Sequence, residues 1–341
     1  MKALVLGGSQ FVGLHTVREL VARGHDVTVL NRGKTTTELL PGVERLVADR
    51  TDGASMRAAL AGKDWDAVFD VSGFVMAAMG SNLSELIDLL DGRVGAYVYT
   101  SSIMAYAPSG SFPWDESFPS VDEGPNGYGG FKKMCEETLL ERHGRNGFPA
   151  SVVRPAAIYG PDNNIYDMEM AYFLRLLRGL PLILPLNGLV TASYGHVDDL
   201  CRVMVDMAQH PKAAGEIFNV TAEGVTTNEY VATLADIVGK PADVVYMPSR
   251  LIGKTEKPAY SHLFGAAHHG ILSIEKARSV LGFEPQYDFR SGHAQTFEWF
   301  MSQHLDKTEE APMDPLWFAS YDFDYEAKLA QQIRTAAKTE E

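Results

Sequence analysis

The sequence has few cysteines, no long apolar run and no excess of basic residues. Only Cys135 and Cys201 are cysteines among 341 residues; two are too few for a disulfide framework, so we expect a reducing compartment, the cytoplasm. No apolar run is long enough to cross a bilayer, so we expect no membrane insertion. The formal net charge is −14, and an acidic surface repels phosphate backbones, which argues against a general nucleic-acid-binding protein.

What the sequence does have is enough apolar residues for a large core, arranged in an alternating pattern. Hydrophobic residues make up 45% of the chain. Short apolar runs predict strands at residues 2–6, 26–30, 45–48, 67–71, 96–100, 150–153 and 216–220. Helical patterns lie between them, including 14–21, 83–90 and 132–141. This alternation predicts an α/β protein with a doubly wound parallel sheet.

After about residue 160 the pattern loosens and predicts a smaller, mixed C-terminal lobe. Helical patterns at 167–178 and 228–238 are separated by stretches rich in proline and glycine. We therefore expect a main domain over 1–165, to which 190–222 returns, a substrate lobe over 166–305 and a tail over 306–341. The tail has aromatic residues around Trp317 and a helical pattern at 325–335, so we expect it to pack on the body or on a partner chain.

A glycine-rich segment follows the first expected strand. It reads Gly7-Gly8-Ser9-Gln10-Phe11-Val12-Gly13. Glycines let the backbone turn tightly and approach a pyrophosphate, whose charge the following helix N-terminus stabilises. The alternative is an ordinary tight turn, but the position at the first strand–helix junction favours a dinucleotide site.

The ends of the second and third expected strands bear on the choice of cofactor. Asn31 stands where an acidic residue would repel a 2′-phosphate, and Arg32 and Lys34 can pair with that phosphate. We therefore expect NADP, with NAD as the alternative; the other interpretation of these residues is a solvated basic turn. Asp49 is placed to accept a hydrogen bond from the adenine amino group, or else serves as a turn residue or helix cap.

The candidate chemistry depends on three residues that follow the expected strand at 96–100. Tyr128 and Lys132 form the only Tyr-x-x-x-Lys in the chain, and positions i and i+4 share one face of a helix. The ammonium stabilises a phenolate, which makes the phenol usable as a base near neutral pH. Ser102, after the strand at 96–100, can hydrogen-bond the reacting oxygen; its alternative is a small polar residue at a strand end.

Together these motifs resemble those of the extended short-chain dehydrogenases, the NAD-dependent epimerase/dehydratase family. The matches run in the family's order and cover roughly residues 1–300: Gly7-Gly8-x-x-Phe11-x-Gly13, Asp49, Ser102 followed by Tyr106, Tyr128-x-x-x-Lys132, Arg154-Pro155-Ala156-Ala157-Ile158-Tyr159-Gly160-Pro161, His196-Val197-Asp198-Asp199-Leu200, Ser273-x-x-Lys276-Ala277 and Leu281-Gly282-Phe283-x-Pro285. The series is far more specific than any one of its parts.

The resemblance implies a Rossmann fold over the main domain and an NAD(P)-dependent oxidoreductase or epimerase. Tyr128 is then the general acid and base, Lys132 also holds the nicotinamide ribose, and Ser102 orients the substrate. Further cofactor contacts are implied at Arg50, Ser72, Gly73, Pro155 and Ile158. The resemblance implies a carbohydrate-like substrate and a homodimer, and it leaves open epimerisation, dehydration and reduction.

Three departures from the family's motifs qualify that expectation. Gln10 replaces the middle glycine of the loop, and Ala157 and Ala192 stand where nucleotide-sugar enzymes carry Asn and Arg. We therefore expect a free or glycosidic sugar, or a polyol, rather than a nucleoside-diphosphate sugar, unless the basic residues Arg175, Arg178 or Arg250 compensate.

The later half of the chain and Gln10 are closest to the branch that contains the chloroplast stem-loop-binding proteins. The alternatives to an enzyme are therefore an RNA-binding or scaffold protein, and an NADP(H) sensor with little turnover. His268 and His269 are adjacent and lack a surrounding Cys/His/Asp cluster, so we expect no metal site.

Overall fold

In a computed structural model, the protein is described over residues 1–34, 38–71, 82–164, 168–257, 259, 269–307 and 322–340. The chain divides into two compact units. Unit 1 comprises Met1–Ala156, Val197–Thr221 and Leu272–Gln286; unit 2 comprises Ala157–His196, Ala222–Ile271 and Tyr287–Glu341. This division differs from the sequence-based one, which placed 157–165 and 190–196 in the main domain and 272–286 in the smaller lobe.

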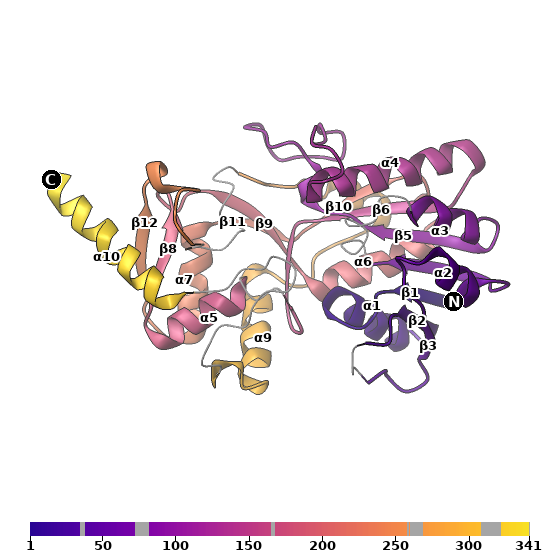
Figure 1. Ribbon diagram of the computed structural model, residues 1–341, viewed down its shortest axis with the longest axis horizontal. Helices are drawn as coiled ribbons and strands as arrows, with labels where there is room; N and C mark the ends of the chain where they lie inside the picture. The colour runs from indigo at the N-terminus through magenta and orange to yellow at the C-terminus, as the bar shows by residue number, and fades with distance from the viewer. Residues whose placement is uncertain are drawn as a thin grey trace. The chain divides into compact units, whose positions relative to one another are not determined.

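Unit 1 is built on a parallel sheet. In the described part of the chain, its strand order is β10-β6-β5-β4-β1-β2-β3 (Figure 1). The strands are β1 (Lys2–Leu6), β2 (Asp26–Asn31), β3 (Glu44–Val47), β4 (Trp65–Asp70), β5 (Val94–Thr100), β6 (Ala150–Pro155) and β10 (Ile217–Val220). Every pair of neighbours runs parallel, so the predicted doubly wound sheet is confirmed.

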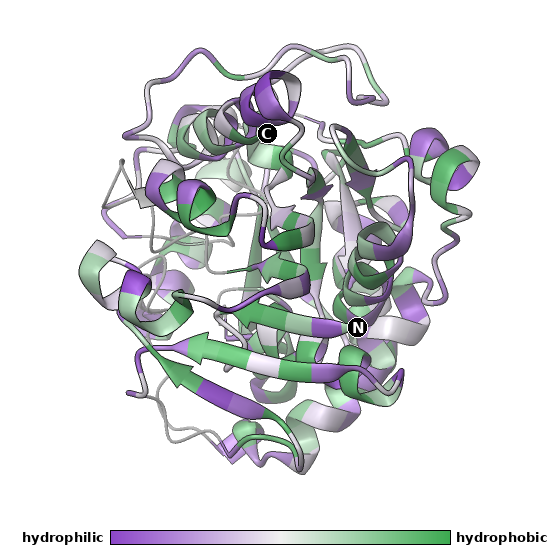
Figure 2. Ribbon diagram, turned by 90° about the vertical axis from the view of Figure 1, so that its right-hand side faces the viewer, coloured by the Kyte–Doolittle hydropathy of each residue, from purple (hydrophilic) through white to green (hydrophobic). Residues whose placement is uncertain are grey.

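Helices cover both faces of this sheet (Figure 1). One face carries α2 (Gly53–Leu60), α3 (Asn82–Leu90) and α4 (Tyr128–Asn146), and the other carries α1 (Phe11–Ala22) and α6 (Val197–Gln209). The short helix η2 (Ile103–Ala105) follows β5, and the short helix α8 (Glu275–Leu281) lies against β10. Because the central strands are covered on both faces, most of their residues are apolar and buried, and green predominates along the strands in Figure 2.

Helix α4 begins four residues earlier than the expected range at 132–141. Gly127 precedes it in an extended conformation, and Gly147 ends it with φ of 76° in the left-handed region that favours glycine. The glycines at 129 and 130 pack where a side chain would collide with backbone, 2.1 Å from the Met104 carbonyl oxygen in the case of Gly129. Tyr128 therefore lies in the first turn of α4, beside the end of β5.

Unit 2 contains a small mixed sheet and a separate pair of parallel strands. The sheet has the order β11-β9-β7, with β9 antiparallel to β11 and parallel to β7, and β12 pairs with β8. The elements are β7 (Ala157–Tyr159), β8 (Pro181–Pro185), β9 (Thr191–His196), β11 (Glu223–Thr226), β12 (Asp243–Met247), α5 (Glu169–Arg178), α7 (Thr227–Val238), η3 (Ser249–Leu251), α9 (Phe289–Ser302), η5 (Leu305–Lys307) and α10 (Phe323–Glu340). The predicted smaller mixed lobe is thus confirmed.

The C-terminal helix α10 packs on the β8–β12 pair. Leu329 and Ala330 are buried there in one cluster with Ile183 and Val245. The segment around Trp317, in which we expected packed aromatic residues, lies outside the described residues. Within the described ranges, no helix is both long enough and apolar enough to cross a membrane.

Candidate functional site

The glycine-rich turn joins β1 to α1 by a close approach of backbone to backbone. Gly7 has φ of 95°, in the left-handed region that favours glycine. A Cβ atom on Gly13 would lie 2.2 Å from the carbonyl oxygen of Gly7, which is far inside van der Waals contact. These two glycines are therefore required by the turn.

The first turn of α1 is suited to an anion. Gln10 is the N-cap residue, but its side chain makes no capping hydrogen bond, and the first turn of α1 contains no acidic residue. The N–H groups at a helix N-terminus and the positive end of the helix dipole stabilise a phosphate there. Gln10 stands at the position of the middle glycine of the loop motif. Its side chain is exposed to solvent and therefore does not fill the turn.

Asn31, at the end of β2, connects the glycine-rich turn to the segment expected to choose the cofactor. Its Nδ2 donates to Ser9 Oγ at 2.7 Å, and its Oδ1 accepts from the backbone N–H of Gly33 at 2.9 Å. Arg32 and Lys34 are exposed beside it. The amide thus fixes the turn while two cations remain at the surface.

Asp49 follows β3 and is held in a local turn. Its Oδ1 accepts from the Thr51 backbone N–H at 2.9 Å and from the Thr51 hydroxyl at 2.7 Å. These hydrogen bonds lower the pKa of Asp49, and the charges of Arg32 and Lys34 lower it further. The two cations expected to face a phosphate therefore lie close enough to Asp49 to affect it.

An ion pair that sequence reasoning missed lies at the ends of β3 and β4. Both terminal nitrogens of Arg50 donate to the carboxylate of Asp70 at 2.5 Å, and the Tyr97 hydroxyl donates to the same group at 2.6 Å. Burial alone would raise the pKa of Asp70, but the charge of Arg50 and these hydrogen bonds outweigh it and hold that pKa low. Arg50, expected to contact the cofactor, is thus bound to Asp70 and buried.

Asp70 could have been noticed as a charged residue that ends an apolar run. Its partner could not, because nothing in the sequence relates Arg50 to Asp70, 20 residues away. The pair ties the segment after β3 to the end of β4, two strands that are not adjacent in the sheet, at the carboxyl edge where ligands bind in this architecture.

Lys132 links the start of α4 to the end of β5. Its Nζ donates to the carbonyl oxygen of Thr100 at 2.7 Å and lies 5.6 Å from the centre of the Tyr128 ring. The Lys132 side chain is buried, whereas Tyr128 is half-buried and so retains access to a ligand. The structure thus brings together the Tyr and Lys that the four-residue spacing placed on one face.

Ser102 stands two residues after Thr100. It is half-buried, and its Oγ accepts from the backbone N–H of Met104 at 3.2 Å, which caps η2. The hydroxyl proton is not used by that contact, so Ser102 can donate a hydrogen bond to a substrate oxygen. The hydroxyl of the preceding Ser101 points elsewhere and donates to buried Glu136.

Tyr106, four residues after Ser102, is the other tyrosine that could act as a base, and the structure argues against it. Its hydroxyl donates to Asn219 Oδ1 at 2.8 Å, and burial raises its pKa to about 12. The guanidinium of Arg154 lies 4.3 Å from the centre of its ring. A buried phenol with a committed proton is a poor general base at neutral pH.

The remaining expected residues are placed as follows. Ser72, Gly73 and His268 lie outside the described residues; Pro155 ends β6 in unit 1 and Ile158 lies in β7 of unit 2. His269 uses its Nδ1 to accept from the Thr191 backbone N–H at 3.2 Å. Among the described residues, no group of three or more His, Cys, Asp or Glu side chains is arranged to hold a metal ion.

The basic residues considered as phosphate ligands lie in unit 2. Arg175 is buried, and its Nε and one terminal nitrogen donate to the carboxylate of Glu326 at 2.9 and 2.7 Å, so it is committed to α10. Arg178 lies over the ring of Phe323, 5.4 Å from its centre, and Arg250 is exposed. Of the three, Arg175 is therefore the least able to replace a missing diphosphate ligand.

Comparison with known proteins agrees with this geometry. Residues 3–221 match the model of the NAD dependent epimerase/dehydratase family. The chloroplast stem-loop binding protein of 41 kDa b from Arabidopsis thaliana is 30% identical over 308 residues, covering 85% of this chain and 77% of that protein. A dTDP-glucose 4,6-dehydratase from an Actinoplanes species is 26% identical over 327 residues, 88% of this chain and 98% of that enzyme.

Among solved structures, a UDP-glucose 4-epimerase from Thermotoga maritima, crystallised with UDP-glucose, shares the fold. It superposes with a TM-score of 0.76 at 24% identity, over 89% of this chain and 100% of that one. With its glycine-rich turn, its parallel sheet and a match over most of its length, the chain belongs to the NAD-dependent epimerase/dehydratase family.

Proposed function

We propose that the protein is an NAD(P)-dependent enzyme that acts at a hydroxyl-bearing carbon of a sugar-like or polyol-like molecule. The observation that carries this proposal is the pair of Tyr128 and Lys132 at the start of α4, with the ammonium 5.6 Å from the phenol ring. Tyr128 takes or returns the hydroxyl proton, and Lys132 stabilises the phenolate. Ser102 donates a hydrogen bond to the reacting oxygen.

The residues present fit a dinucleotide. The turn between Gly7 and Gly13 is so tight that a Cβ on Gly13 would collide with the Gly7 carbonyl oxygen, and the first turn of α1 has no side-chain cap. When bound, the dinucleotide supplies a hydride acceptor or donor. Arg32 and Lys34, with Asn31 in place of an acidic residue, favour NADP over NAD.

We also propose that the protein forms a homodimer. Light scattering of the purified protein tests this.

The nucleotide that purified protein releases tests this function and narrows the reaction. Retained NAD⁺ or NADP⁺ favours epimerisation or dehydration, because the reduced cofactor is reoxidised within one turnover. An empty site that binds added NADP(H) favours a reductase that exchanges its cofactor. Failure to bind either dinucleotide at millimolar concentration would contradict the proposal.

For the substrate, we propose a free or glycosidic sugar or a polyol rather than a nucleoside-diphosphate sugar. Ala157 and Ala192 offer no charged group, and Arg175 is bound to Glu326. A buried diphosphate needs charge-assisted partners, each worth about 1.5–3 kcal/mol. Calorimetry against UDP-, GDP- and dTDP-sugars with NADP⁺ bound tests this; micromolar binding that is lost when the diphosphate is removed would contradict it.

RNA binding is a second candidate function, favoured by one observation: a relative 30% identical to this chain is named a stem-loop binding protein. The net charge of −14 argues against it. A gel-shift titration with a structured stem-loop, at low and at physiological salt, separates the two. Submicromolar binding at physiological salt, without turnover of any carbinol, would favour the RNA-binding function.

A further inference from the structure

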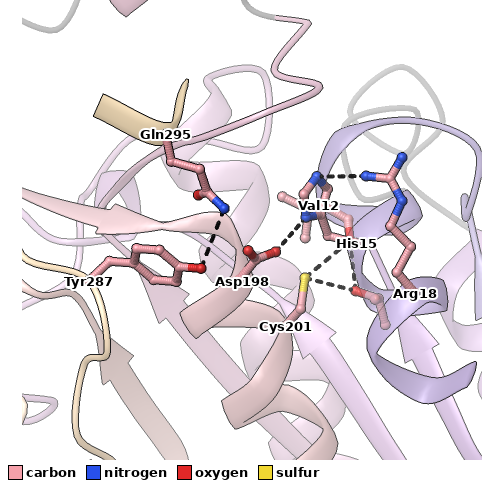
Figure 3. A network of polar contacts seen from close by, with 8 residues as sticks. Val12, His15, Arg18, Asp198, Cys201, Tyr287 and Gln295 are labelled. Carbon is pink, nitrogen blue, oxygen red and sulfur yellow. Dashed lines mark hydrogen bonds and ion pairs between the residues drawn. The ribbon is translucent and has the colours of Figure 1, made fainter. Parts of the chain in front are cut away.

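Polar contacts fasten α1, the helix that follows the glycine-rich turn, to α6 at two places within unit 1. At the C-terminal cap of α1, Arg23 Nη1 lies 2.6 Å from Asp206 Oδ1. In the N-terminal half, His15 Nδ1 lies 2.6 Å from Asp198 Oδ1. Figure 3 marks this contact with a dashed line. The two contacts have similar lengths, but only the second is near the turn.

The hydrogen bonds of His15 fix its proton. A guanidinium only donates, and Arg18 Nη1 lies 3.3 Å from His15 Nε2, so His15 Nε2 is the acceptor. The proton is therefore on Nδ1, which donates to the carboxylate of Asp198. The side chain of His15 is only 6% exposed, whereas that of Asp198 is 40% exposed. Asp198 thus sets the orientation of a ring that is otherwise enclosed.

The His15 ring contacts Phe11, the first residue of α1. The two ring centres are 6.5 Å apart and the planes meet at 77°, an edge-to-face arrangement. Phe11 has φ of 36°, a left-handed conformation that is strained for a residue with a side chain. Strain of this kind persists only where the surroundings hold it, and the Phe11 side chain is held against His15.

Cys201 provides a second connection from α6 to the same turn. Its Sγ donates to the carbonyl oxygen of Val12 at 3.4 Å, and Thr16 Oγ1 donates to that oxygen at 2.7 Å (Figure 3). Burial raises the pKa of the Cys201 thiol, so it remains protonated and able to donate. Because Asp198 and Cys201 are three residues apart on a helix, they face α1 together.

We infer that His15 and Asp198 are positioning residues for the dinucleotide. Asp198 orients His15, His15 holds the strained conformation of Phe11, and that conformation directs the first N–H groups of α1 toward the pyrophosphate. Neither residue needs to touch the ligand. The inference rests on the proposed function, because it assigns that turn to the dinucleotide.

Two matched variants test the inference. Asp198→Ala removes the contact with His15, and Asp206→Ala removes the contact with Arg23. The two contacts have the same length of 2.6 Å, and both aspartates are partly exposed. We expect Asp198→Ala to weaken NADP⁺ binding about fivefold or more in calorimetry, and Asp206→Ala less than about twofold. Asp198→Asn keeps an acceptor for His15 and should recover much of the affinity. In a double-mutant cycle, His15→Ala and Asp198→Ala should not be additive.

Hydrogen exchange tests the positioning without any ligand. The amides of residues 8–14 should exchange faster in Asp198→Ala than in wild type or Asp206→Ala. Equal effects of the two variants on affinity, or unchanged exchange in a folded Asp198→Ala, would overturn the inference. If wild type binds no dinucleotide, the proposed function fails, and faster exchange confined to Asp198→Ala would still support the effect on the turn.

Discussion

The ammonium of Lys132 in α4 donates a hydrogen bond to the carbonyl oxygen of Thr100, the last residue of β5, at 2.7 Å. This contact fastens the first turn of α4 to the carboxyl end of the sheet. The same ammonium lies 5.6 Å from the centre of the Tyr128 ring. The position of the phenol therefore depends on a buried cation as well as on the helix that carries it.

Replacing Tyr128 with Phe should abolish most of the chemistry while leaving cofactor binding intact. The ring and its contact with Lys132 remain, but the proton donor and acceptor is gone. We expect the chemical rate to fall about 10²–10⁴-fold, with NADP⁺ affinity close to wild type. Single-turnover kinetics and calorimetry measure the two quantities separately.

Tyr246→Phe is the matched control for that variant. Tyr246 lies in β12, is 46% exposed and donates to Asn228 Oδ1 at 3.0 Å. The control therefore also removes a tyrosine hydroxyl, but from a residue far from α4 in the chain. We expect it to turn over normally. Near-normal turnover in Tyr128→Phe would remove Tyr128 from the mechanism.

The local features of the site could be predicted from sequence because short-range rules govern them. The glycine-rich turn follows from the position of Gly7 and Gly13 after an apolar run, and the Tyr128–Lys132 pair from the helical period. The sheet follows from the alternation of strands and helices.

Contacts between distant residues could not be predicted in this way. Arg50, which follows β3 and was expected to contact the cofactor, forms a buried ion pair with Asp70 at the end of β4. Similarly, Arg175 was considered as a phosphate ligand, but its partner Glu326 is 151 residues away on α10. No periodicity relates such positions, and only the folded arrangement shows which charge neutralises which.

Cofactor choice should depend on Arg32. Its exposed guanidinium follows Asn31 at the end of β2, where a 2′-phosphate is expected. We expect Arg32→Ala to weaken NADP⁺ binding about tenfold and to change NAD⁺ binding little. Arg57→Ala, which removes an exposed arginine from α2, is the control. Equal losses for both dinucleotides in Arg32→Ala, or tighter NAD⁺ than NADP⁺ binding in wild type, would contradict the assignment.

The C-terminal helix should contribute strongly to the stability of unit 2 through one ion pair. Arg175 and Glu326 are 5% and 2% exposed, so Glu326→Ala leaves a buried guanidinium without its counter-charge. We expect a loss of about 3–5 kcal/mol in the free energy of unfolding. Arg175→Met combined with Glu326→Leu should recover most of it, because no buried charge then remains.

Urea unfolding followed by circular dichroism measures these differences. The control is Asp236→Ala, which breaks the exposed Arg290–Asp236 pair and should cost about 0–1 kcal/mol. A loss in Glu326→Ala no larger than in this control would show that α10 contributes little through its ion pair.

The stability of unit 2 should also fall in acid because of His293. This residue is completely buried in α9, its Nδ1 bonds the Phe289 carbonyl oxygen at 2.7 Å, and its ring stacks on Tyr159 at 3.7 Å. Burial disfavours the charged imidazolium and lowers the pKa of His293 from its ordinary value of 6.5 to about 3.

The sign of the effect follows from proton binding. Between pH 6.5 and about 3 the unfolded chain binds a proton at His293 that the folded chain excludes, so lowering the pH favours unfolding. The contribution of neutral His293 to the free energy of unfolding is fully present above pH 6.5 and falls by at most about 1.4 kcal/mol per pH unit below it.

His293→Phe keeps a ring against Tyr159 but removes the titrating group, so the free energy of unfolding of this variant should depend less steeply on pH between 4 and about 6.5. Urea midpoints measured across that range give the slope, with His304→Asn, at an exposed position, as the control. Parallel curves for wild type and His293→Phe would show that His293 does not govern the acid sensitivity of unit 2.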